Sequence, residues 1–379
     1  MDVPRSHPVR RRTLLAAAGA AVAAASATAG RAAAADPGGR TAPAALTARQ
    51  LAGQRVIYSY PGLTLPSGLL STIRAGEAAG VIFFGENVSG DSQIASVVAQ
   101  LVAANASSPV QSPLLLMTDQ EGGEVRRLPG APTLSEKQIG AAAQAQAAAT
   151  QAGSGAGQNL GGVGMNVNLA PVLDVFYQSG NFIDEYQRSY SSNPSTVSSL
   201  GSAFIAAQQT TGVAATAKHF PGLGAATASQ NTDAGPVTLT QSLSRLRSVD
   251  ELPYQAAIAA GVRLVMVSWA VYTALDASHP AGLSSVVVQQ ELRQRLGFTG
   301  VTVTDALEAG AISASYGTGR RAVMAAGAGM DLLLCSARST SQGDTAAQAL
   351  ADAYTSGQLP SAAFDTAVQR VTSLRNSLA

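Results

Sequence analysis

Short apolar runs alternate with longer stretches of helical character along most of the chain, and this alternation predicts repeated strand–helix units. The apolar runs that we expect to form strands are 55–60, 80–85, 114–119, 165–172, 214–220, 264–272, 301–305 and 331–335. Helical segments between them include 91–106, 195–210, 247–260 and 286–296, and 344–356 and 361–378 follow as closing helices. Eight strands with crossover helices favour a single-domain α/β fold, a parallel sheet closed into a (β/α)8 barrel of the TIM type. An open, doubly wound sheet is the alternative.

Polar residues gather where several of these strands end. The run 212–217 is apolar and leads into Lys218-His219-Phe220-Pro221-Gly222, in which proline and glycine stop the strand. A strand that is buried on both faces should not carry such side chains internally. The other strand ends of this kind carry Asp119, Asp174, Ser268-Trp269 and Asp305. Because α/β barrels place their ligands at the carboxyl ends of the strands, we expect one shared pocket there.

Length and composition are compatible with this fold. The 379 residues exceed the roughly 250 that one α/β barrel needs. Hydrophobic residues make up 46% of the chain and charged residues 12%, so a large core is expected and disorder is not.

The N-terminus has the features of a targeting segment. Arg10-Arg11-Arg12 precedes Thr13-Leu14-Leu15 and an alanine-rich run, and small residues lie before Asp36. This order resembles a twin-arginine export signal, so we expect residues 1–35 to be a signal peptide and the protein to be secreted or extracytoplasmic. An uncleaved anchor or a basic tail is the alternative. Residues 36–47 are expected to be a flexible spacer, and residues 48–379 to be the barrel.

Charge and cysteine content narrow the range of partners. Without residues 1–35 the chain has 19 basic and 22 acidic residues, a net charge of −3, so no basic patch points to nucleic acid. The only cysteine, Cys335, follows an apolar run and is expected to be a buried, inert thiol. Beyond the targeting segment we find no apolar run long enough to span a bilayer, so stable membrane insertion is not expected.

Three segments together resemble a known family. Asp119-Gln120-Glu121-Gly122-Gly123, Lys218-His219-Phe220-Pro221-Gly222 and Thr304-Asp305-Ala306-Leu307-Glu308 are similar to the signatures of glycoside hydrolase family 3. Their order and spacing resemble the single-domain β-N-acetylhexosaminidases of bacterial cell-wall recycling. The resemblance implies a (β/α)8-type barrel that hydrolyses terminal β-linked N-acetylglucosamine or a related sugar. It further implies retention of anomeric configuration, a carbohydrate as the substrate, and no metal or other cofactor.

The resemblance also assigns roles to residues of this chain. Asp305 matches the nucleophile, and a carboxylate at the end of a strand can attack an anomeric carbon; a cap on the following helix is the alternative. Five residues match positions that grip sugar hydroxyls, and ion pairing around the strand ends is the alternative for each of them. These residues are Asp119, Arg127, Arg188, Lys218 and His219. Gly122-Gly123 suits a tight turn. For Asp174, the positioning of a neighbouring loop is the alternative to a direct role in the site.

The chain departs from the family pattern at the general acid/base. Relatives use an Asp-x-His pair on the loop after the fifth strand, and counting along this chain puts the pair at Ser229 and Asn231. Neither residue can exchange a proton near neutral pH, so we consider Asp233 as a displaced acid/base, with an ordinary turn residue as the alternative.

Two further uncertainties follow from the sequence. Trp269, the only tryptophan, occupies a strand end where many relatives carry a histidine, and either stacks on a sugar or fills the barrel mouth. The rival function is a noncatalytic or weakly active saccharide-binding protein that has lost turnover together with the Asp-x-His pair.

Overall fold

The computed structural model describes residues 45–378. The predicted signal peptide and most of the predicted spacer lie outside these residues. The described part starts with a short coil that leads into α1(Ala48–Gly53), and the Thr47 hydroxyl accepts a hydrogen bond from the Gln50 N–H at 3.2 Å to cap this helix. From Leu46 onward the residues form one compact unit.

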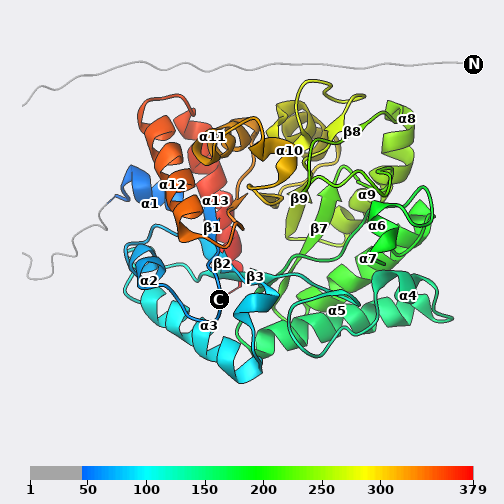
Figure 1. Ribbon diagram of the computed structural model, residues 1–379, viewed down its shortest axis with the longest axis horizontal. Coiled ribbons are helices and arrows are strands. Elements are labelled where there is room, and N and C mark those ends of the chain that lie inside the picture. Colours follow the sequence, from blue (N-terminus) through cyan, green and yellow to red (C-terminus); the bar gives the residue numbers. More distant parts are fainter. Residues whose placement is uncertain (1–44, 379) are drawn as a thin grey trace, which may run out of the picture. The chain divides into compact units, whose positions relative to one another are not determined.

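Eight parallel strands form the centre of this unit, as the sequence predicts (Figure 1). In order around the sheet they are β1(Val56–Tyr58), β2(Gly80–Ile82), β3(Leu115–Thr118), β6(Val167–Asn168), β7(Ala214–Phe220), β9(Leu264–Val267), β11(Val301–Thr304) and β12(Leu333–Leu334). The first strand pairs with the last, and a bridge between Val303 and Leu332 joins β11 to the segment that enters β12. The sheet therefore closes on itself, which confirms the (β/α)8 barrel and excludes the open sheet.

Two of the predicted runs continue well past the barrel strands that they contain. The run 264–272 splits after Val267, and β10(Val271–Tyr272) pairs with β8(Thr238–Leu239) in a separate two-stranded sheet. The run 165–172 contributes only β6 to the barrel, apart from one bridge between Val172 and Lys218. Apolar residues continue past the barrel strands in both cases because they are buried under the loops at the carboxyl end.

The crossover helices surround the strands, and four of the helices predicted from the pattern appear close to their expected bounds. The longer helices are α2(Ser67–Arg74), α3(Asp91–Asn105), α5(Ala145–Gly162), α7(Pro194–Gln209), α9(Leu252–Ala259), the π-helical segment Val286–Arg295, α11(Thr318–Ala328), α12(Thr340–Thr355) and α13(Ser361–Ser377). Short helices lie on the loops: α4(Glu136–Gly140), α6(Phe182–Glu185), α8(Leu243–Arg245) and α10(Gly310–Ser313). None of the helices in residues 45–378 has the length and apolar character needed to cross a membrane.

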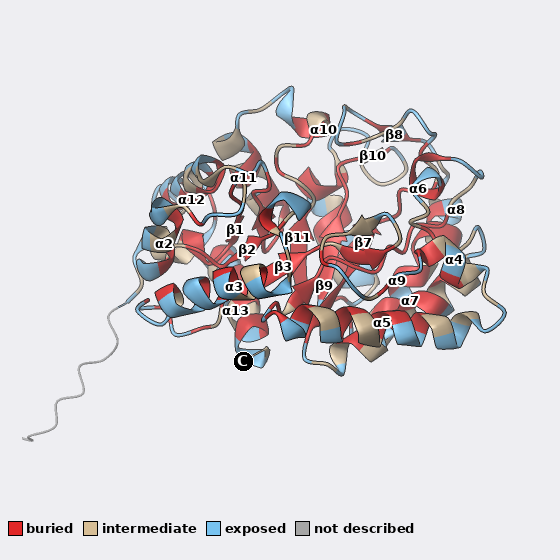
Figure 2. Cartoon of the chain, turned by 60° about the horizontal axis from the view of Figure 1, so that its bottom comes forward, coloured by how far each residue is buried: buried red, intermediate tan, exposed pale blue. Residues whose placement is uncertain are grey.

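The core has two layers, and their position determines where a ligand can enter. Apolar side chains inside the barrel pack on Val371 and Leu374 of α13, which closes the end where the strands begin. A second layer fills the space between the strands and the surrounding helices, whose outer faces are exposed (Figure 2). Cys335 belongs to this layer and is buried, as expected, and its burial raises the pKa of the thiol. The opposite end, where the strands finish, is left for the site.

Candidate active site

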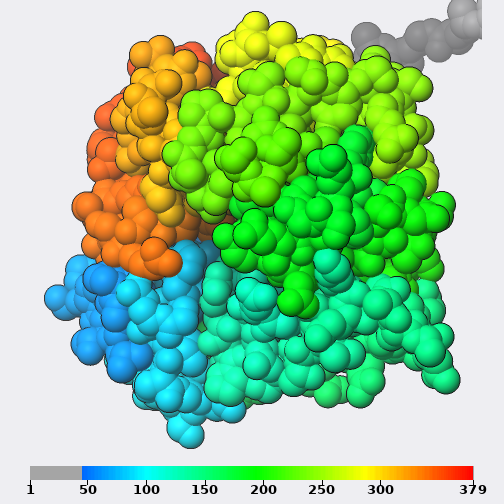
Figure 3. Space-filling model, turned by 45° about the vertical axis from the view of Figure 1, so that its right-hand side comes forward, coloured from blue at the N-terminus to red at the C-terminus, as the bar shows by residue number. Residues whose placement is uncertain are grey.

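A cavity of about 370 Å³ lies at the carboxyl ends of the strands. Segments from across the chain contribute to it, and blue-cyan, green and orange segments come together on the face shown in Figure 3. Seven of the residues singled out in the sequence line this one cavity: Asp119, Arg127, Arg188, Lys218, His219, Asp233 and Asp305. The expected convergence of distant polar residues on a shared pocket is therefore present.

The floor of the cavity is a network of charges around Lys218. The Lys218 side chain is 2% exposed, and its ammonium nitrogen lies 2.7 Å from Asp119 Oδ1 and 2.7 Å from Glu121 Oε1. Glu121 also accepts two hydrogen bonds from the Arg188 guanidinium, both at 2.9 Å. Burial alone would raise the pKa of Glu121, but Arg188 and Lys218 outweigh it and hold that pKa well below its usual value. In the same way Asp119 and Glu121 outweigh the effect of burial and raise the pKa of Lys218.

Glu121 is a residue whose role the sequence reasoning missed, although it belongs to the first motif. It lies on a small hairpin, β4(Gln120–Gly122) and β5(Val125–Arg126), that follows β3. Gly122 has a φ of +114°, and a Cβ on it would lie 2.2 Å from the Leu134 carbonyl oxygen, so the expected tight turn and close approach are both present. The hairpin places Asp119 and Arg127 at the cavity wall and Glu121 beneath it.

His219 is held in place by Asp174. Its Nδ1 lies 2.8 Å from Asp174 Oδ2, and the other oxygen of this fully buried carboxylate accepts a hydrogen bond from the Leu223 N–H at 2.7 Å. His219 Nε2 is 3.4 Å from the Arg188 guanidinium at the cavity wall. Asp174 therefore positions the histidine as well as the loop that follows it.

Asp305 directly follows β11 and continues its ladder, because its N–H bonds to the Val267 carbonyl oxygen at 3.2 Å. Its Oδ1 accepts a hydrogen bond from the Ala306 N–H at 2.7 Å. The next helix, α10, begins five residues later at Gly310, with Ala309 at the N-cap position and no side-chain cap. Asp305 does not cap that helix, so the alternative considered for it from the sequence does not apply.

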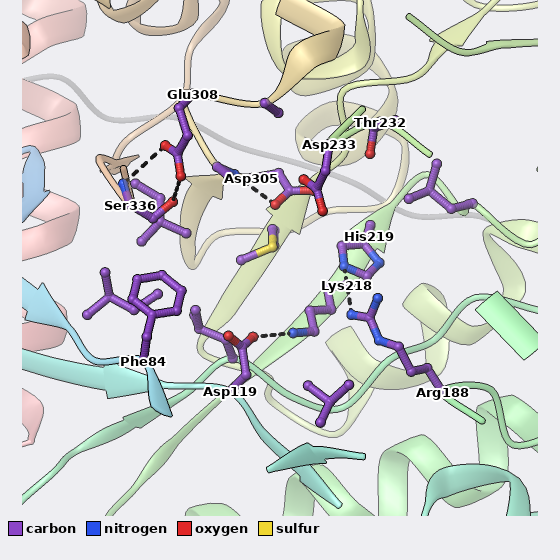
Figure 4. A pocket seen from close by; sticks show the side chains of 18 of the residues that line it. Phe84, Asp119, Arg188, Lys218, His219, Thr232, Asp233, Asp305, Glu308 and Ser336 are labelled. Carbon is purple, nitrogen blue, oxygen red and sulfur yellow. Dashed lines mark hydrogen bonds and ion pairs between the residues drawn. The ribbon is translucent and has the colours of Figure 1, made fainter. Parts of the chain in front are cut away.

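Asp233 lies beside Asp305 although it comes from a different loop (Figure 4). The loop is held against the start of α10, where the Gly310 N–H donates to the Asp233 carbonyl oxygen at 2.8 Å. A Cβ on Gly310 would lie 2.5 Å from the Ala234 carbonyl oxygen, so this close approach requires glycine. The Asn231 side chain accepts a hydrogen bond from the Asp233 N–H at 2.8 Å, which is the turn geometry that the sequence allows.

The environment of Asp233 changes its proton affinity. The residue as a whole is exposed at the cavity mouth, and its side chain contributes to the cavity lining. Burial of the carboxyl and the negative charge of Asp305 raise its pKa to about 6, against the opposing effect of His219 and Arg188. Ser229 and Asn231, where counting placed the proton-transferring pair, do not line the cavity.

Trp269 is fully buried and is not part of the cavity lining. Its indole N–H donates to the Ala306 carbonyl oxygen at 2.8 Å, directly after Asp305. Of the two roles that the sequence left open, its position favours packing. Glu308, which the sequence reasoning did not assign, lines the cavity and is held by the Ser336 hydroxyl at 2.7 Å.

Residues 45–378 thus form a barrel whose pocket combines paired carboxylates with buried cations. This arrangement is typical of a glycoside hydrolase. The chain matches the glycosyl hydrolase family 3 N terminal domain over residues 67–374. It belongs to that family, which confirms the resemblance found in the sequence.

Individual relatives agree with this assignment. An "Uncharacterized secreted glycosyl hydrolase" of Arthroderma benhamiae is 45% identical over 89% of this chain and 96% of its own length. Beta-hexosaminidase A of Pseudoalteromonas piscicida is 31% identical over 89% of this chain, which spans 62% of that protein. A family 3 β-N-acetylglucosaminidase structure from a Paenibacillus species superimposes with a TM-score of 0.83 at 36% identity, over 88% of this chain and 63% of that one.

Proposed function

We propose that this protein is an exported, retaining β-glycosidase that removes terminal β-linked N-acetylglucosamine or a related sugar. The observation that carries the proposal is a second carboxyl, Asp233, placed beside Asp305 with its pKa raised to about 6. Two carboxyl groups whose environments separate their proton affinities are what a retaining glycosidase needs. The names of the relatives support N-acetylglucosamine as the sugar.

The reaction proceeds in two steps. In the first, Asp305 attacks the anomeric carbon to form a glycosyl ester, and protonated Asp233 gives its proton to the departing oxygen. In the second, the Asp233 carboxylate takes a proton from water, and that water attacks the anomeric carbon and releases Asp305. Both steps invert the anomeric carbon, so the configuration is retained overall.

The remaining cavity residues hold the sugar that is transferred. Lys218, Arg188 and His219 present donors to its hydroxyl groups, and Asp119 presents an acceptor. Glu121 fixes both Lys218 and Arg188 from below, so these side chains are already ordered before the sugar binds. Ion pairing and sugar binding are compatible here because the paired groups also face the cavity.

The position of the proposed acid/base also accounts for the missing Asp-x-His pair. Asn231-Thr232-Asp233 keeps the two-residue spacing of that pair, with an amide in place of its carboxylate and a carboxyl in place of its imidazole. An imidazole has a pKa of about 6.5 in water, and the raised pKa of Asp233 brings a carboxyl close to that value. We therefore infer that Asp233 replaces the family's histidine, displaced from the position that counting gave.

The test measures release of 4-nitrophenol from its β-N-acetylglucosaminide and β-glucoside by the chain without residues 1–35. We expect hydrolysis of the first, with the β-anomer formed initially, and loss of turnover in Asp305→Asn. Asp352→Asn is the matched control, because that aspartate lies on the exposed face of α12. Equal rates in wild type and Asp305→Asn would refute the nucleophile.

Covalent labelling distinguishes the proposed glycosidase from the rival function, a saccharide-binding protein. A saccharide-binding protein without turnover would bind N-acetylglucosamine but form no covalent adduct. A fluorinated N-acetylglucosaminyl fluoride accumulates the glycosyl-enzyme, and mass spectrometry of the peptides is expected to find the label on Asp305. Sugar binding without any label would favour the rival.

Export through a twin-arginine signal is part of the proposal. Arg11-Arg12 followed by Thr13-Leu14-Leu15 supports it, and the A. benhamiae relative is named as secreted. We expect residues 1–47 to export a folded reporter from a bacterial host and the double change Arg11→Lys, Arg12→Lys to retain it. Export that is indifferent to this change would point to another route.

A further inference from the structure

A second, smaller pocket of about 240 Å³ adjoins the active-site cavity. Its lining residues are Phe84, Gly85, Glu86, Arg127 and Arg338, and we refer to it as the side pocket. Phe84, Arg127 and Arg338 also line the main cavity, so the two spaces share a wall.

The side pocket contains two guanidinium groups, those of Arg127 and Arg338, that have few hydrogen-bond and ion-pair partners within the described residues. The carboxylate nearest to Arg127 is Asp119, whose Oδ2 is 4.0 Å away because Oδ1 is held by Lys218 at 2.7 Å. The Nε of Arg127 is buried and has no hydrogen-bond partner among the described residues. Arg338 pairs through Nε with Glu86 at 3.0 Å and lies over the Phe84 ring at 4.5 Å. Glu86 is the only carboxylate that pairs with Arg338 within 4.0 Å in the described part of the chain.

The backbone of Arg338 is held in an unusual conformation. Its φ is +54°, a value that residues other than glycine rarely adopt. Its N–H donates to the Ser59 hydroxyl at 2.9 Å, and that hydroxyl donates to the Cys335 carbonyl oxygen at 2.8 Å. These bonds keep Arg338 at the junction of the two spaces. A strained residue that presents its side chain to a site is a reason to look for a function there.

We propose that the side pocket binds an oxyanion, a sulfate or phosphate ester, carried by the sugar that occupies the main cavity. This proposal rests on the proposed function and names its substrate class: terminal β-linked N-acetylhexosamine with an anionic substituent. Guanidinium groups are the usual partners of such oxyanions because their donors match two oxygens at once.

The location of the side pocket determines which edge of the sugar carries the substituent. Phe84 and Asp119 lie on the side of the main cavity away from Asp233 (Figure 4). A sugar whose anomeric carbon faces Asp305 and Asp233 therefore turns its opposite edge, with O4 and O6, toward Arg127 and Arg338. The carboxylate of Glu86 repels an anion in the side pocket, so its charge limits the preference for an anionic sugar over an unsubstituted one.

The test compares kcat/KM for 4-nitrophenyl β-N-acetylglucosaminide with the values for its 6-sulfate, 4-sulfate and 6-phosphate. We expect a sulfated or phosphorylated substrate to exceed the unsubstituted one by about tenfold in wild type, the gain of about one charge-assisted hydrogen bond. The 6-sulfate and 6-phosphate arms distinguish the two sources of the oxyanion. The preference is expected to shrink at high salt, since the side pocket is open to solvent.

Three variants separate charge from packing. Arg338→Met keeps an apolar stem on Phe84 but removes the charge. We expect it to bring the ratio of kcat/KM for the charged substrate to kcat/KM for the unsubstituted one close to 1. Arg338→Lys is expected to restore part of the preference for the charged substrate. Glu86→Gln is expected to raise the ratio, because it removes the competing carboxylate. The matched control is Arg320→Met, since Arg320 also lies over an aromatic ring, that of Tyr316 at 4.7 Å, but lines neither space.

Binding of the free sugars makes the result independent of turnover. Calorimetry compares the Kd of N-acetylglucosamine with that of its 6-sulfate and 6-phosphate in wild type and Arg338→Met. If wild type hydrolyses none of the substrates but still binds the charged sugars more tightly through Arg338, the proposed function is wrong and the proposal for the side pocket stands. A wild-type ratio near 1, or a preference that Arg338→Met leaves intact, would overturn the side pocket whatever the activity.

Discussion

Replacing Asp233 with alanine tests the least familiar part of the proposed mechanism. The change removes a carboxyl whose pKa lies at about 6 because of its burial and the charge of Asp305. At pH 7 a group of that pKa holds a proton in about one molecule in ten, which is enough for it to act as a general acid. The variant keeps Asp305, so the first covalent step remains possible for substrates that need no proton.

The size of the effect depends on the leaving group. General acid catalysis typically contributes about 10²–10⁴-fold. We expect kcat/KM for N,N′-diacetylchitobiose to fall by that factor in Asp233→Ala, because its leaving group is a poor one. The value for the 2,4-dinitrophenyl glycoside should change by less than about tenfold, since that leaving group departs without a proton. Azide is expected to accelerate turnover of the variant and to give the β-glycosyl azide.

The pH profile gives a second readout. In wild type, kcat/KM for a poor leaving group should decline above about pH 6, as Asp233 loses its proton. Asp233→Ala should lack this alkaline limb. Asp233→Asn separates catalysis from the turn, because the amide keeps the shape but transfers no proton. Equal losses for both leaving groups, or wild-type activity in Asp233→Asn, would refute the assignment.

Three further changes test the surroundings of the site. Gly310→Ala forces a Cβ to within 2.5 Å of the Ala234 carbonyl oxygen, so it should displace the loop and reproduce the leaving-group dependence of Asp233→Ala; uniform kinetics across leaving groups would speak against this. Glu121→Ala leaves buried cations without their shared partner and should lower the free energy of unfolding by about 3–5 kcal/mol, measured in denaturant; a loss under 1 kcal/mol would contradict the network. Asp250 is fully buried, and burial raises its pKa to about 7, so its contribution to stability is present below pH 4 and is lost as the pH rises to 7. The stability of Asp250→Asn relative to wild type should therefore increase over that interval by up to about 4 kcal/mol, and a constant difference in urea unfolding would show that Asp250 does not titrate there.

The sequence predicted the barrel well because its strands are nearly continuous apolar runs with breakers at their ends. The run 214–220 coincides with β7, and Pro221 follows it directly. Polar residues at the ends of strands are equally easy to recognise in the sequence, because a buried parallel strand tolerates them only where it reaches the end of the barrel. For this reason the positions of Asp119, Lys218 and Asp305 in one cavity follow from the pattern alone.

Residues whose roles depend on distant partners could not be assigned in this way. Glu121 acts through Arg188, 67 residues further along the chain, and no local pattern records that pairing. The position of Asp233 depends on a backbone contact with Gly310, a glycine that looks ordinary in the sequence. Counting along the loop could not place Asp233 at the cavity, because the loop's path depends on its contact with α10 as well as on its length.

In the proposed mechanism, the proximity of Asp233 to Asp305 also accounts for how one carboxyl can serve both steps. In the free enzyme the negative charge of Asp305 helps to keep Asp233 protonated, as an acid requires. Formation of the glycosyl ester removes that charge, while His219 and Arg188, which lower the pKa of Asp233, remain. The pKa of Asp233 must then fall, and the same carboxyl becomes the base that the second step needs. A histidine in this position would respond in the same direction, since loss of a neighbouring negative charge lowers the pKa of an imidazolium as well. In the proposed mechanism a carboxyl can replace the imidazole only as long as burial and Asp305 keep its resting pKa high. We therefore expect the docking of the loop on α10, which places Asp233 there, to matter for catalysis as well.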